Sequence, residues 1–575
     1  MKIALCQQNY HIGNFEANTN KILEGISAAK SQGADLVVFS ELSVCGYPPR
    51  DFLEFRDFLD ECNNAIETIA DAADGIGVIV GAPAANPQKE GKDLFNAAWF
   101  LYNGKVHGMA YKTLLPTYDI FDEYRYFEPS NQWNVIEFKG RKIALTICED
   151  LWNIGDNPLY RRCPMDELAR QSPDVMINIS ASPFDYDHDD DRKEVLLANV
   201  RKYKIPLIYC NTVGSQTEIV FDGGSLVVDA MANLRSEMKY FEEDLLVVDD
   251  GELYEGRQPG SIDTSVDREI RQLDIQMRVA KVDDHNKIIE YMTKEENVSQ
   301  IHRALVLGIK DYFGKMGFTK AILGSSGGID SAVTLALACE ALGKDNVRAI
   351  LMPSEFSTGH SVDDAVELSK NLGNPYDIIP IKPVYDAFLQ QLEPLFKDLP
   401  FSVAEENIQS RSRGNILMAI ANKFGYVLLN TSNKSELATG YGTLYGDMAG
   451  GLSVLGDLYK MQVYALARYI NRNETIIPEN IITKAPSAEL RPGQKDSDSL
   501  PEYEVLDKVL YQYIEKRKGP DELIDMGIDE ALVRRVLKLV NTNEYKRNQF
   551  CPIIRVSCKA FGIGRRMPIV GKYLS

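Results

Sequence analysis

The sequence predicts an α/β protein with two domains, and three observations lead to this prediction. A chain of 575 residues exceeds the length over which one hydrophobic core keeps growing, so at least two domains are expected. In the first half, strand and helix patterns alternate and short turns join pairs of strands, which predicts a layered α/β sandwich. In the second half, strands near residues 321, 348, 377 and 427 alternate with helices, which predicts a parallel, doubly wound sheet.

The elements of the first half follow from its apolar patterns. Residues 2–7, 36–39 and 78–80 are short apolar runs typical of buried strands. Residues 18–32 show the spacing of an amphipathic helix, and residues 53–73 predict a second helix. The segment Tyr102-Asn103-Gly104-Lys105 predicts a tight hairpin turn after a strand. Further strands are expected at 96–102, 141–146, 175–179, 207–210 and 224–228.

A polar and charged stretch separates the two halves. Residues 249–299 include Gly-Arg-Gln-Pro-Gly at 256–260 and predict a connector that is partly helical. A helix over residues 296–316 then opens the second domain. We therefore expect domains over residues 1–250 and 298–575, joined by a connector over residues 251–297.

The composition argues against several classes of protein. A net charge of −20 argues against nonspecific binding to nucleic acid or to an anionic membrane. Nine cysteines without paired metal-type spacing and six scattered histidines indicate reduced thiols and no zinc site. The chain enters a strand pattern at its first residues, and no apolar run reaches about 18 residues. We therefore expect a cytoplasmic protein without a signal peptide, a membrane span or a nucleic-acid partner.

The most informative segment is residues 324–331, Gly-Ser-Ser-Gly-Gly-Ile-Asp-Ser. A strand pattern enters it and a helix pattern leaves it, so unpaired N–H groups at the helix N-terminus would favour a bound phosphate. The segment is no Walker A loop, because no Lys follows its second glycine position. Its Asp would repel phosphate unless Mg²⁺ lay between them, and a turn without any ligand is the alternative. The segment resembles the pyrophosphate loop of ATP pyrophosphatases, which implies ATP binding by Gly324, Ser325, Ser326, Gly327, Gly328, Ile329, Asp330 and Ser331.

Three polar residues of the first half stand at the ends of predicted strands: Glu41, Lys112 and Cys148. Such a set can do nucleophilic chemistry: the carboxylate takes the thiol proton, the thiolate attacks a carbonyl and the ammonium stabilises the oxyanion. A thiol by itself is mostly protonated at neutral pH, so it needs both partners. Taken singly, the Cys could fill a core and the Glu and Lys could be solvated strand caps.

The surroundings of these three residues resemble the nitrilase/amidase superfamily over roughly the first 250 residues. The resemblance lies in Glu41 with Gly-Tyr-Pro-Pro-Arg-Asp after it, in Lys112, and in the segment Cys-Glu-Asp-Leu-Trp from Cys148. It implies an αββα sandwich in which Glu41 is the base, Lys112 the oxyanion stabiliser and Cys148 the nucleophile. Such a site forms a thioester and releases ammonia.

The same resemblance implies further site residues. Tyr118, Ser182 and Glu123 would form the glutamine-binding part of the site, and Glu123, the second glutamate, would also help to position Lys112. The contact to the glutamine α-carboxylate stays open. The matching region holds Asp185, His188 and Asp189, and an arginine follows only at Arg192.

Three segments after the phosphate loop carry dense polar groups or many glycines. Residues 405–413, Glu-Glu-Asn-Ile-Gln-Ser-Arg-Ser-Arg, open a helix pattern, for which an ordinary solvated helix start is the alternative. Residues 428–436, Leu-Leu-Asn-Thr-Ser-Asn-Lys-Ser-Glu, follow a strand and begin irregular chain. In them Glu436 could be a second carboxylate for Mg²⁺, and Lys434 could neutralise phosphate. Residues 441–458 are rich in glycine, which suggests close approach of the backbone to a ligand.

Together these segments resemble the NAD synthetase family over about residues 300–575. The resemblance implies a Rossmann-like ATP pyrophosphatase domain with a mobile loop near residues 484–490. It implies that Asn407, Glu436 and Lys546 contact deamido-NAD, that Thr431 contacts ATP with residues 324–331, and that Asp330 and Glu436 hold Mg²⁺.

The two resemblances combined imply a glutamine-dependent ligase with ATP as co-substrate and Mg²⁺ as cofactor. ATP would adenylate the nicotinate carboxylate of deamido-NAD, and ammonia from glutamine would displace AMP to give NAD⁺, with pyrophosphate and glutamate as further products. Because the family is usually oligomeric, a homo-oligomer is expected. Two alternatives stay open: another glutamine-dependent amidotransferase of the pyrophosphatase type, and a nitrilase-like amidase whose second half only senses ATP.

Overall fold

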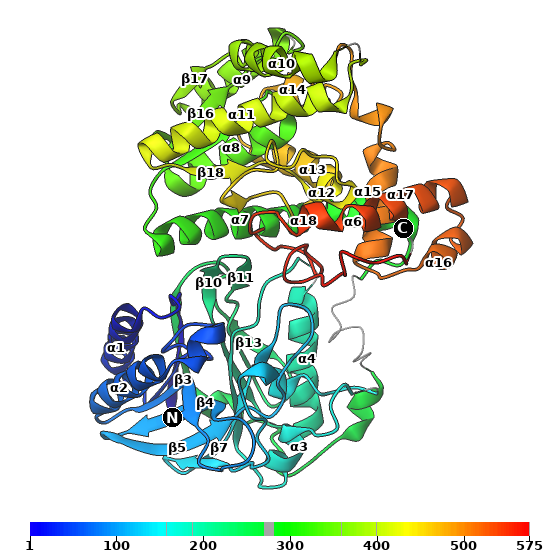
Figure 1. The fold of residues 1–575 in the computed structure, drawn as a ribbon. Coiled ribbons are helices and arrows are strands. Elements are labelled where there is room, and N and C mark those ends of the chain that lie inside the picture. Colours follow the sequence, from blue (N-terminus) through cyan, green and yellow to red (C-terminus); the bar gives the residue numbers. More distant parts are fainter. Residues whose placement is uncertain (157, 187, 270–280, 358, 398, 574–575) are drawn as a thin grey trace. The chain divides into compact units, whose positions relative to one another are not determined.

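The computed structural model describes residues 1–573 apart from 157, 187, 270–280, 358 and 398. The chain forms two compact units, Met1–Val279 and Ala280–Ser575 (Figure 1). The predicted connector over 251–297 includes residues 270–280, which lie outside the described residues. Its described residues up to 269 belong to the first unit and those from 281 to the second. The division into domains over residues 1–250 and 298–575 with a connector over residues 251–297 stays a prediction.

The first unit is built on two six-stranded mixed sheets and a small hairpin. One sheet has the order β14 (Asp244–Asp249), β1 (Lys2–Gln7), β2 (Leu36–Val38), β3 (Gly77–Ala85), β4 (Leu94–Tyr102), β5 (Lys105–Tyr111). The other has the order β13 (Leu234–Glu237), β12 (Leu226–Val228), β9 (Leu207–Asn211), β8 (Val175–Ser180), β7 (Arg141–Ile147), β6 (Ile136–Phe138). The hairpin pairs β10 (Val213–Gln216) with β11 (Ile219–Asp222).

Helices cover the outer faces of both sheets. An apolar core of residues such as Leu5, Ile79 and Ile177 fills the space between the sheets. A second core lies under α1 (Phe15–Ser31) and α2 (Arg56–Ala72), and a third under α3 (Pro164–Ala169) and α4 (His188–Tyr203). This is an αββα sandwich, as the sequence predicted.

The structure corrects one helix and confirms the hairpin turn. Residues 53–73 are not a single helix, because Arg50–Glu54 form a 3₁₀ turn and Phe55 is extended before α2 begins. Phe55 has φ −96° and ψ 124°, which lie outside the helical region, so the chain does not run as one helix through this residue. The turn between β4 and β5 has Asn103 and Gly104 at positive φ, as a tight hairpin requires.

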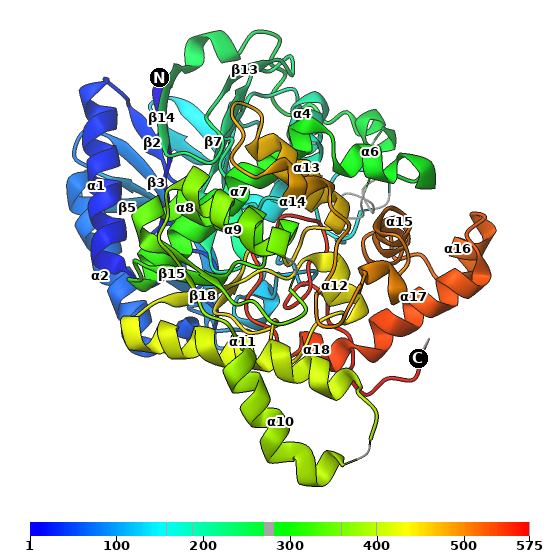
Figure 2. The same ribbon diagram turned by 90° about the horizontal axis from the view of Figure 1, so that it is seen from above.

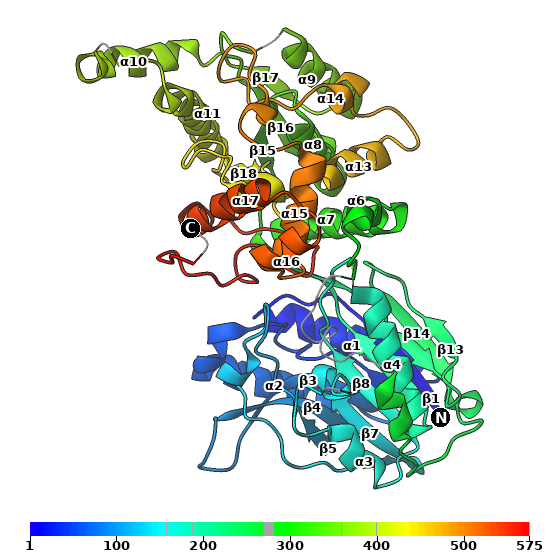
Figure 3. The same ribbon diagram turned by 90° about the vertical axis from the view of Figure 1, so that its right-hand side faces the viewer.

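The second unit contains a five-stranded sheet in which every pairing is parallel. The order is β17 (Tyr376–Ile378), β16 (Val347–Leu351), β15 (Ala321–Gly324), β18 (Val427–Asn430), β19 (Leu452–Ser453) (Figure 3). The chain order therefore runs outward in both directions from β15, which makes the gap between β15 and β18 a topological switch point. Ligands of such sheets bind at the carboxyl ends of the strands beside this point. The predicted doubly wound sheet is confirmed.

Helices surround this sheet and form a second apolar core. Those that pack on or near the sheet are α7 (Glu295–Met316), α8 (Ile329–Leu342), α9 (Gly359–Leu372), α11 (Val403–Phe424), α13 (Lys460–Ile470) and α14 (Glu479–Thr483). A helical core joins α6 (Ile288–Met292), α12 (Lys434–Thr439), α15 (Tyr503–Ile514), α16 (Pro520–Asp525) and α17 (Glu530–Thr542), with α18 (Glu544–Arg547) after them. Within the second unit, α10 (Lys382–Phe396) projects beyond α11 (Figure 2). Among the described residues, no helix is both long and apolar enough to cross a membrane.

One short helix was missed by the sequence analysis. Residues 434–439 were expected to be irregular, yet they form α12. Asn433 caps it: its side chain accepts a hydrogen bond from the N–H of Glu436, whose carboxylate accepts one from the N–H of Asn433. The tetrapeptide Asn-Lys-Ser-Glu carries this signal, because a capping residue followed three positions later by Glu is typical of a helix start.

Candidate active sites

The first candidate site gathers at strand ends of the first unit. Glu41 follows β2 by three residues, Lys112 directly follows β5, and Cys148 directly follows β7. The three side chains are 2 %, 0 % and 6 % exposed, so bulk water is excluded from them. Cys148 has a positive φ of 43°, a left-handed conformation that few side chains other than glycine adopt. The nucleophile candidate thus sits on a sharply turned backbone, as the chain leaves the strand.

Lys112 lies between two carboxylates. Its Nζ donates to Glu41 Oε1 at 2.7 Å and to Glu123 Oε1 at 2.8 Å. Glu123 also accepts a hydrogen bond of 2.8 Å from the hydroxyl of Tyr47. Burial alone would lower the pKa of Lys112, but the charges of Glu123 and Glu41 outweigh burial and hold this pKa well above its usual range. Lys112 is therefore an ammonium fixed in one place.

The electrostatics at Cys148 favour the thiol in the resting site. Burial raises its pKa, and the negative charge of Glu41 raises it further, although Lys112 opposes both effects. A base must therefore take the thiol proton as the sulfur attacks. Of the carboxylates, Glu41 has the largest electrostatic effect on the Cys148 thiol, which fits its predicted role.

A second buried carboxylate, Glu149, lies beside the nucleophile. The hydroxyl of Tyr118 donates to it at 2.9 Å and that of Tyr160 at 3.1 Å. Burial raises the pKa of Glu149 to about 7. Sequence reasoning named Tyr118 but missed Glu149 and Tyr160. The position of Glu149 next to Cys148 was the available signal.

The remaining residues predicted to hold glutamine have these contacts. Glu123 bonds Lys112 and Tyr47, which favours a role in holding Lys112. Ser182 is buried, and its backbone N–H donates to Asn211 Oδ1 at 2.9 Å. A role for either residue in binding glutamine stays a prediction.

Arg192, the arginine left open for the glutamine α-carboxylate, forms a buried ion pair. Its two terminal nitrogens donate to the carboxylate of Asp222 at 2.8 and 2.7 Å. Asp185 is likewise buried, and the side chains of His188 and Asp189 lie outside the described residues. The bidentate pairing does not favour Arg192 as a free anchor for a substrate carboxylate.

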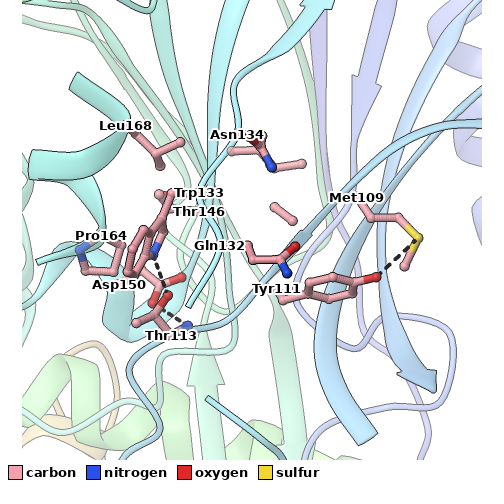
Figure 4. A pocket seen from close by; sticks show the side chains of 12 residues that line it. Met109, Tyr111, Thr113, Gln132, Trp133, Asn134, Thr146, Asp150, Pro164 and Leu168 are labelled. Carbon is pink, nitrogen blue, oxygen red and sulfur yellow. Dashed lines mark hydrogen bonds between the residues drawn. The ribbon is translucent and has the colours of Figure 1, made fainter. Parts of the chain in front are cut away.

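A cavity of about 100 Å³ borders this site (Figure 4). Tyr111 and Thr113 line it on either side of Lys112, and Asp150 lines it two positions after Cys148. Neighbours along an extended chain face opposite sides, so Lys112 can point to the nucleophile while Tyr111 and Thr113 point to the cavity. The cavity therefore lies beside the two chain segments that carry Lys112 and Cys148.

Asp150 joins two parts of that scaffold. Its carboxylate accepts hydrogen bonds from the backbone N–H groups of Thr113 and Leu114 at 2.9 Å and of Ile147 at 3.1 Å. The first two groups follow Lys112 and the third precedes Cys148. One buried carboxylate thus ties together the two segments that carry catalytic candidates.

The second candidate site lies at the switch point of the second unit. Residues 324–331 run from the end of β15 into the start of α8, as the sequence predicted. Gly327 has φ 76°, and a Cβ there would lie 2.1 Å from the carbonyl oxygen of Ser361. Ser326 and Ser331 bond each other and Gly328 within the turn. The loop thus needs glycine at position 327 and is ordered by its own hydroxyl groups.

Asp330 and Glu436, the predicted metal ligands, share one lysine. Lys460 Nζ lies 2.6 Å from Asp330 Oδ2 and 3.3 Å from Glu436 Oε1, and Asn433 Nδ2 donates to Asp330 Oδ1 at 2.8 Å. Burial and the charges of Asp330 and Asp496 raise the pKa of Glu436 to about 8. The sequence analysis gave Lys460 no role, so the structure adds it to the site.

Three further predicted residues lie on neighbouring segments. Thr431 directly follows β18 at the switch point. Asn407, on α11, accepts a hydrogen bond of 2.8 Å from the Thr443 hydroxyl. Lys546, on α18, donates to the carbonyl oxygens of Gly440 and Gly442 at 2.7 and 2.8 Å. The contacts of Asn407 and Lys546 meet in the glycine-rich segment after α12, and their roles in dinucleotide binding stay predictions.

Each of the two units matches a known protein family. The carbon-nitrogen hydrolase family matches residues 2–250, and the NAD synthase family matches residues 301–550. A glutamine-dependent NAD(+) synthetase of Synechocystis is 43 % identical over 99 % of this chain and 98 % of its own length. The chain belongs to the glutamine-dependent NAD(+) synthetase family. The Thermotoga maritima member is 40 % identical over 100 % of this chain and 99 % of its own.

Solved structures of this family agree with the assignment. A glutamine-dependent NAD+ synthetase from Acinetobacter baumannii, solved with ADP, is 35 % identical, with a TM-score of 0.73 over 99 % of this chain and 98 % of its own. The enzyme from Cytophaga hutchinsonii matches with a TM-score of 0.78 over 99 % of this chain and 98 % of its own. Its identity of 18 % supports the fold alone. The resemblance predicted from the motifs is therefore confirmed for the whole chain.

Within this family fold, one interpretation of the sequence was wrong. Lys434 was expected to neutralise phosphate, but its side chain is fully buried in a structural network. Its Nζ bonds Asp457 at 2.9 Å, Glu515 at 2.5 Å and the Ser557 hydroxyl at 2.8 Å. Two buried carboxylates attract the ammonium more strongly than the solvent-facing site, so Lys460 is the lysine that faces Asp330.

Proposed function

We propose that the chain makes NAD⁺ by amidating deamido-NAD with ammonia taken from glutamine, at the expense of ATP. Membership of the glutamine-dependent NAD(+) synthetase family supports the overall reaction. The single observation that carries the proposal is the buried Glu41–Lys112–Glu123 cluster beside Cys148, because a synthetase fed by free ammonia would have no need for it.

In the first unit, we assign the glutaminase step to Cys148, Glu41 and Lys112. Glu41 accepts the proton from Cys148 Sγ as the sulfur attacks the carboxamide carbon of glutamine. The Lys112 ammonium stabilises the negative charge that develops on the carboxamide oxygen. The proton returns to the nitrogen as ammonia leaves, and water then hydrolyses the thioester to glutamate. The raised pKa of Cys148 fits this order of events, in which attack and proton transfer are coupled.

Glutamine also carries two charged groups at its α-carbon that the site must match. Glu149 supplies a negative charge for the α-ammonium, and the hydroxyl of Tyr118 holds that carboxylate in place. Ser182 contributes from the same sheet, two residues after the end of β8, the neighbour of the strand that leads to Cys148 and Glu149. One oxygen of Glu123 accepts hydrogen bonds from both Lys112 and Tyr47, so we assign to Glu123 the role of holding Lys112, the oxyanion stabiliser, in position.

In the second unit, we assign ATP binding to residues 324–331 and Thr431. The loop presents helix N-terminal N–H groups to phosphate, and the absence of room for a side chain at Gly327 keeps the backbone close. Asn407, Glu436 and Lys546 are assigned to deamido-NAD. The nicotinate carboxylate attacks the α-phosphate, pyrophosphate leaves, and ammonia displaces AMP.

Mg²⁺ fits the donor set around Lys460. Asp330 and Glu436 offer hard oxygen ligands, and a divalent cation would favour the ionised form of Glu436, whose pKa is raised by burial and by the charges of Asp330 and Asp496. Within the described residues no cluster of three or more side chains forms a metal cage. This is compatible with Mg²⁺, which commonly takes one or two carboxylates and completes its shell with phosphate and water. Bound there, the ion would neutralise phosphate charge.

We also propose that the protein is a cytoplasmic homo-oligomer. The nine cysteines, all unpaired thiols, fit a reducing compartment. Light scattering after size exclusion would test the oligomer, with a monomeric mass contradicting it.

The test of the function is NAD⁺ formation from deamido-NAD, ATP and Mg²⁺ with either glutamine or ammonium. The wild-type protein should use both nitrogen sources and release AMP and pyrophosphate. Cys148→Ala should lose glutamine use and keep ammonium use, whereas Cys62→Ala, which removes a buried thiol elsewhere in the same unit, should keep both. Loss of both sources in Cys148→Ala would contradict two separate sites. No product with either source would reject deamido-NAD and favour another amidotransferase of the pyrophosphatase type.

A further inference from the structure

Asn96 contacts both charged members of the glutaminase site. It lies on β4 and is fully buried. Its side-chain Nδ2 donates to Glu41 Oε1 at 2.7 Å, and its backbone carbonyl accepts the N–H of Lys112 at 2.9 Å. Any substitution of the side chain leaves the backbone contact in place, so the amide group can be examined separately.

The side chain of Asn96 has no evident structural purpose apart from Glu41. Its Oδ1 is buried and accepts no hydrogen bond within the described part of the chain. A buried polar atom without a partner typically costs about 1–3 kcal/mol. A leucine of similar size would avoid this cost and pack equally well against the sheet. An asparagine that is unfavourable for stability points to a function of its amide.

The hydrogen bonds of Glu41 show what the amide does. Glu41 Oε1 accepts from both Asn96 Nδ2 and Lys112 Nζ, each at 2.7 Å. Within the part of the chain that the structure describes, Glu41 Oε2 accepts only the backbone N–H of Ala181, at 3.0 Å. Ala181 directly follows β8, the neighbour of the strand that ends at Cys148. Oε2 therefore faces the sheet that carries the nucleophile, and it keeps a lone pair for a proton.

We propose that Asn96 is a positioning residue of the glutaminase: with Lys112 it occupies Glu41 Oε1 and so leaves Oε2 as the atom that takes the proton from Cys148. The S–H bond breaks, its electron pair stays on sulfur, and an O–H bond forms at Oε2. This proposal rests on the proposed glutaminase function.

Two variants of nearly equal size test the amide. Asn96→Leu removes the donor, and Asn96→Asp places a second carboxylate against Glu41. Asn18→Ala is the control, since Asn18 is another buried asparagine of the same unit and bonds the backbone of His11 and Val44. Glutamate release from glutamine is measured across pH, together with ammonium-dependent NAD⁺ formation and tryptophan fluorescence.

For Asn96→Leu we expect kcat for glutamine hydrolysis to fall roughly 10- to 100-fold, the usual range for a hydrogen bond to a charged group, with little change in KM. The acidic limb of the kcat/KM profile, which reports ionisation of the base, should move to higher pH in Asn96→Leu and further in Asn96→Asp. Ammonium-dependent synthesis should be unchanged in both. Asn18→Ala should not move the limb.

Three results would overturn the proposal. They are an unmoved acidic limb in both variants, a change in KM alone, and a first unit that is unfolded in both variants, which would assign Asn96 to stability. A wild-type protein that releases no glutamate from glutamine would instead refute the proposed function, so the two failures are distinguishable.

Discussion

Replacing Lys434 with Met should strongly destabilise the second unit. The methionine fills nearly the same volume, so no cavity is created and the loss is electrostatic. Lys434 is the cation between Asp457 and Glu515, and all three side chains are 0 % exposed. Breaking a buried ion pair by removing one partner typically costs about 3–5 kcal/mol.

The contacts indicate which carboxylate causes the loss. Asp457 keeps three hydrogen bonds without Lys434, from the N–H of Val556 and from the N–H and hydroxyl of Ser557. Among the described residues, Glu515 keeps only the hydrogen bond from the thiol of Cys558, at 2.8 Å. The orphaned charge is therefore that of Glu515. Neutralising it in Lys434→Met/Glu515→Gln should recover roughly 1–3 kcal/mol, the size of coupling found for residues in one network.

Urea unfolding can follow the two units separately. All three tryptophans, at positions 99, 133 and 152, belong to the first unit, so their fluorescence serves as an internal control. Far-UV circular dichroism reports both units. With a slope of about 3 kcal/mol/M, the second-unit midpoint should fall by about 1–1.7 M in Lys434→Met while the tryptophan transition stays in place. A shift below about 0.3 M, or a double variant less stable than the single one, would refute the argument.

Three further predictions concern the loop, a buried acid and the oxyanion stabiliser. Gly327→Ala should abolish ammonium-dependent NAD⁺ formation, because the new Cβ would lie 2.1 Å from the Ser361 carbonyl oxygen. The control Gly359→Ala, whose Cβ would meet nothing within 4 Å, should remain active. An active Gly327→Ala would contradict the assignment of the loop. Burial raises the pKa of Asp507 from 3.8 to about 7, so the folded form binds the extra proton and its stability should fall as pH rises from about 4 to 7. Urea midpoints of Asp507→Asn should decline less over this range, because Glu436 in the same unit also has a raised pKa, and equal slopes in both proteins would count against the prediction. Lys112→Met should lower kcat with glutamine by about 10²–10³ and spare ammonium use, as steady-state assays with each nitrogen source would reveal.

The sequence identified groups whose signal is local. The phosphate loop at 324–331 was found because a strand, a glycine-rich turn and a helix start follow one another along the chain. Glu41, Lys112 and Cys148 were found because each follows an apolar run, and strand ends of packed sheets tend to meet. Lys434 and Lys460 could not be told apart in this way. Both stand at the first position of a helix beside polar residues, and only their distant partners differ.

Read alone, the sequence determined the α/β class, both layered architectures and the residue types of two active sites, because apolar periodicity and short motifs depend on neighbours along the chain. The tertiary structure decided which side chains form ion pairs and hydrogen bonds with one another. It placed Lys460 between Asp330 and Glu436, buried Lys434 with Glu515, and brought Asn96 to the carboxylate of Glu41. These contacts join residues 24 to 130 positions apart. Hydrogen bonds and ion pairs act over a few ångströms, so they exist only after the fold has brought such residues together.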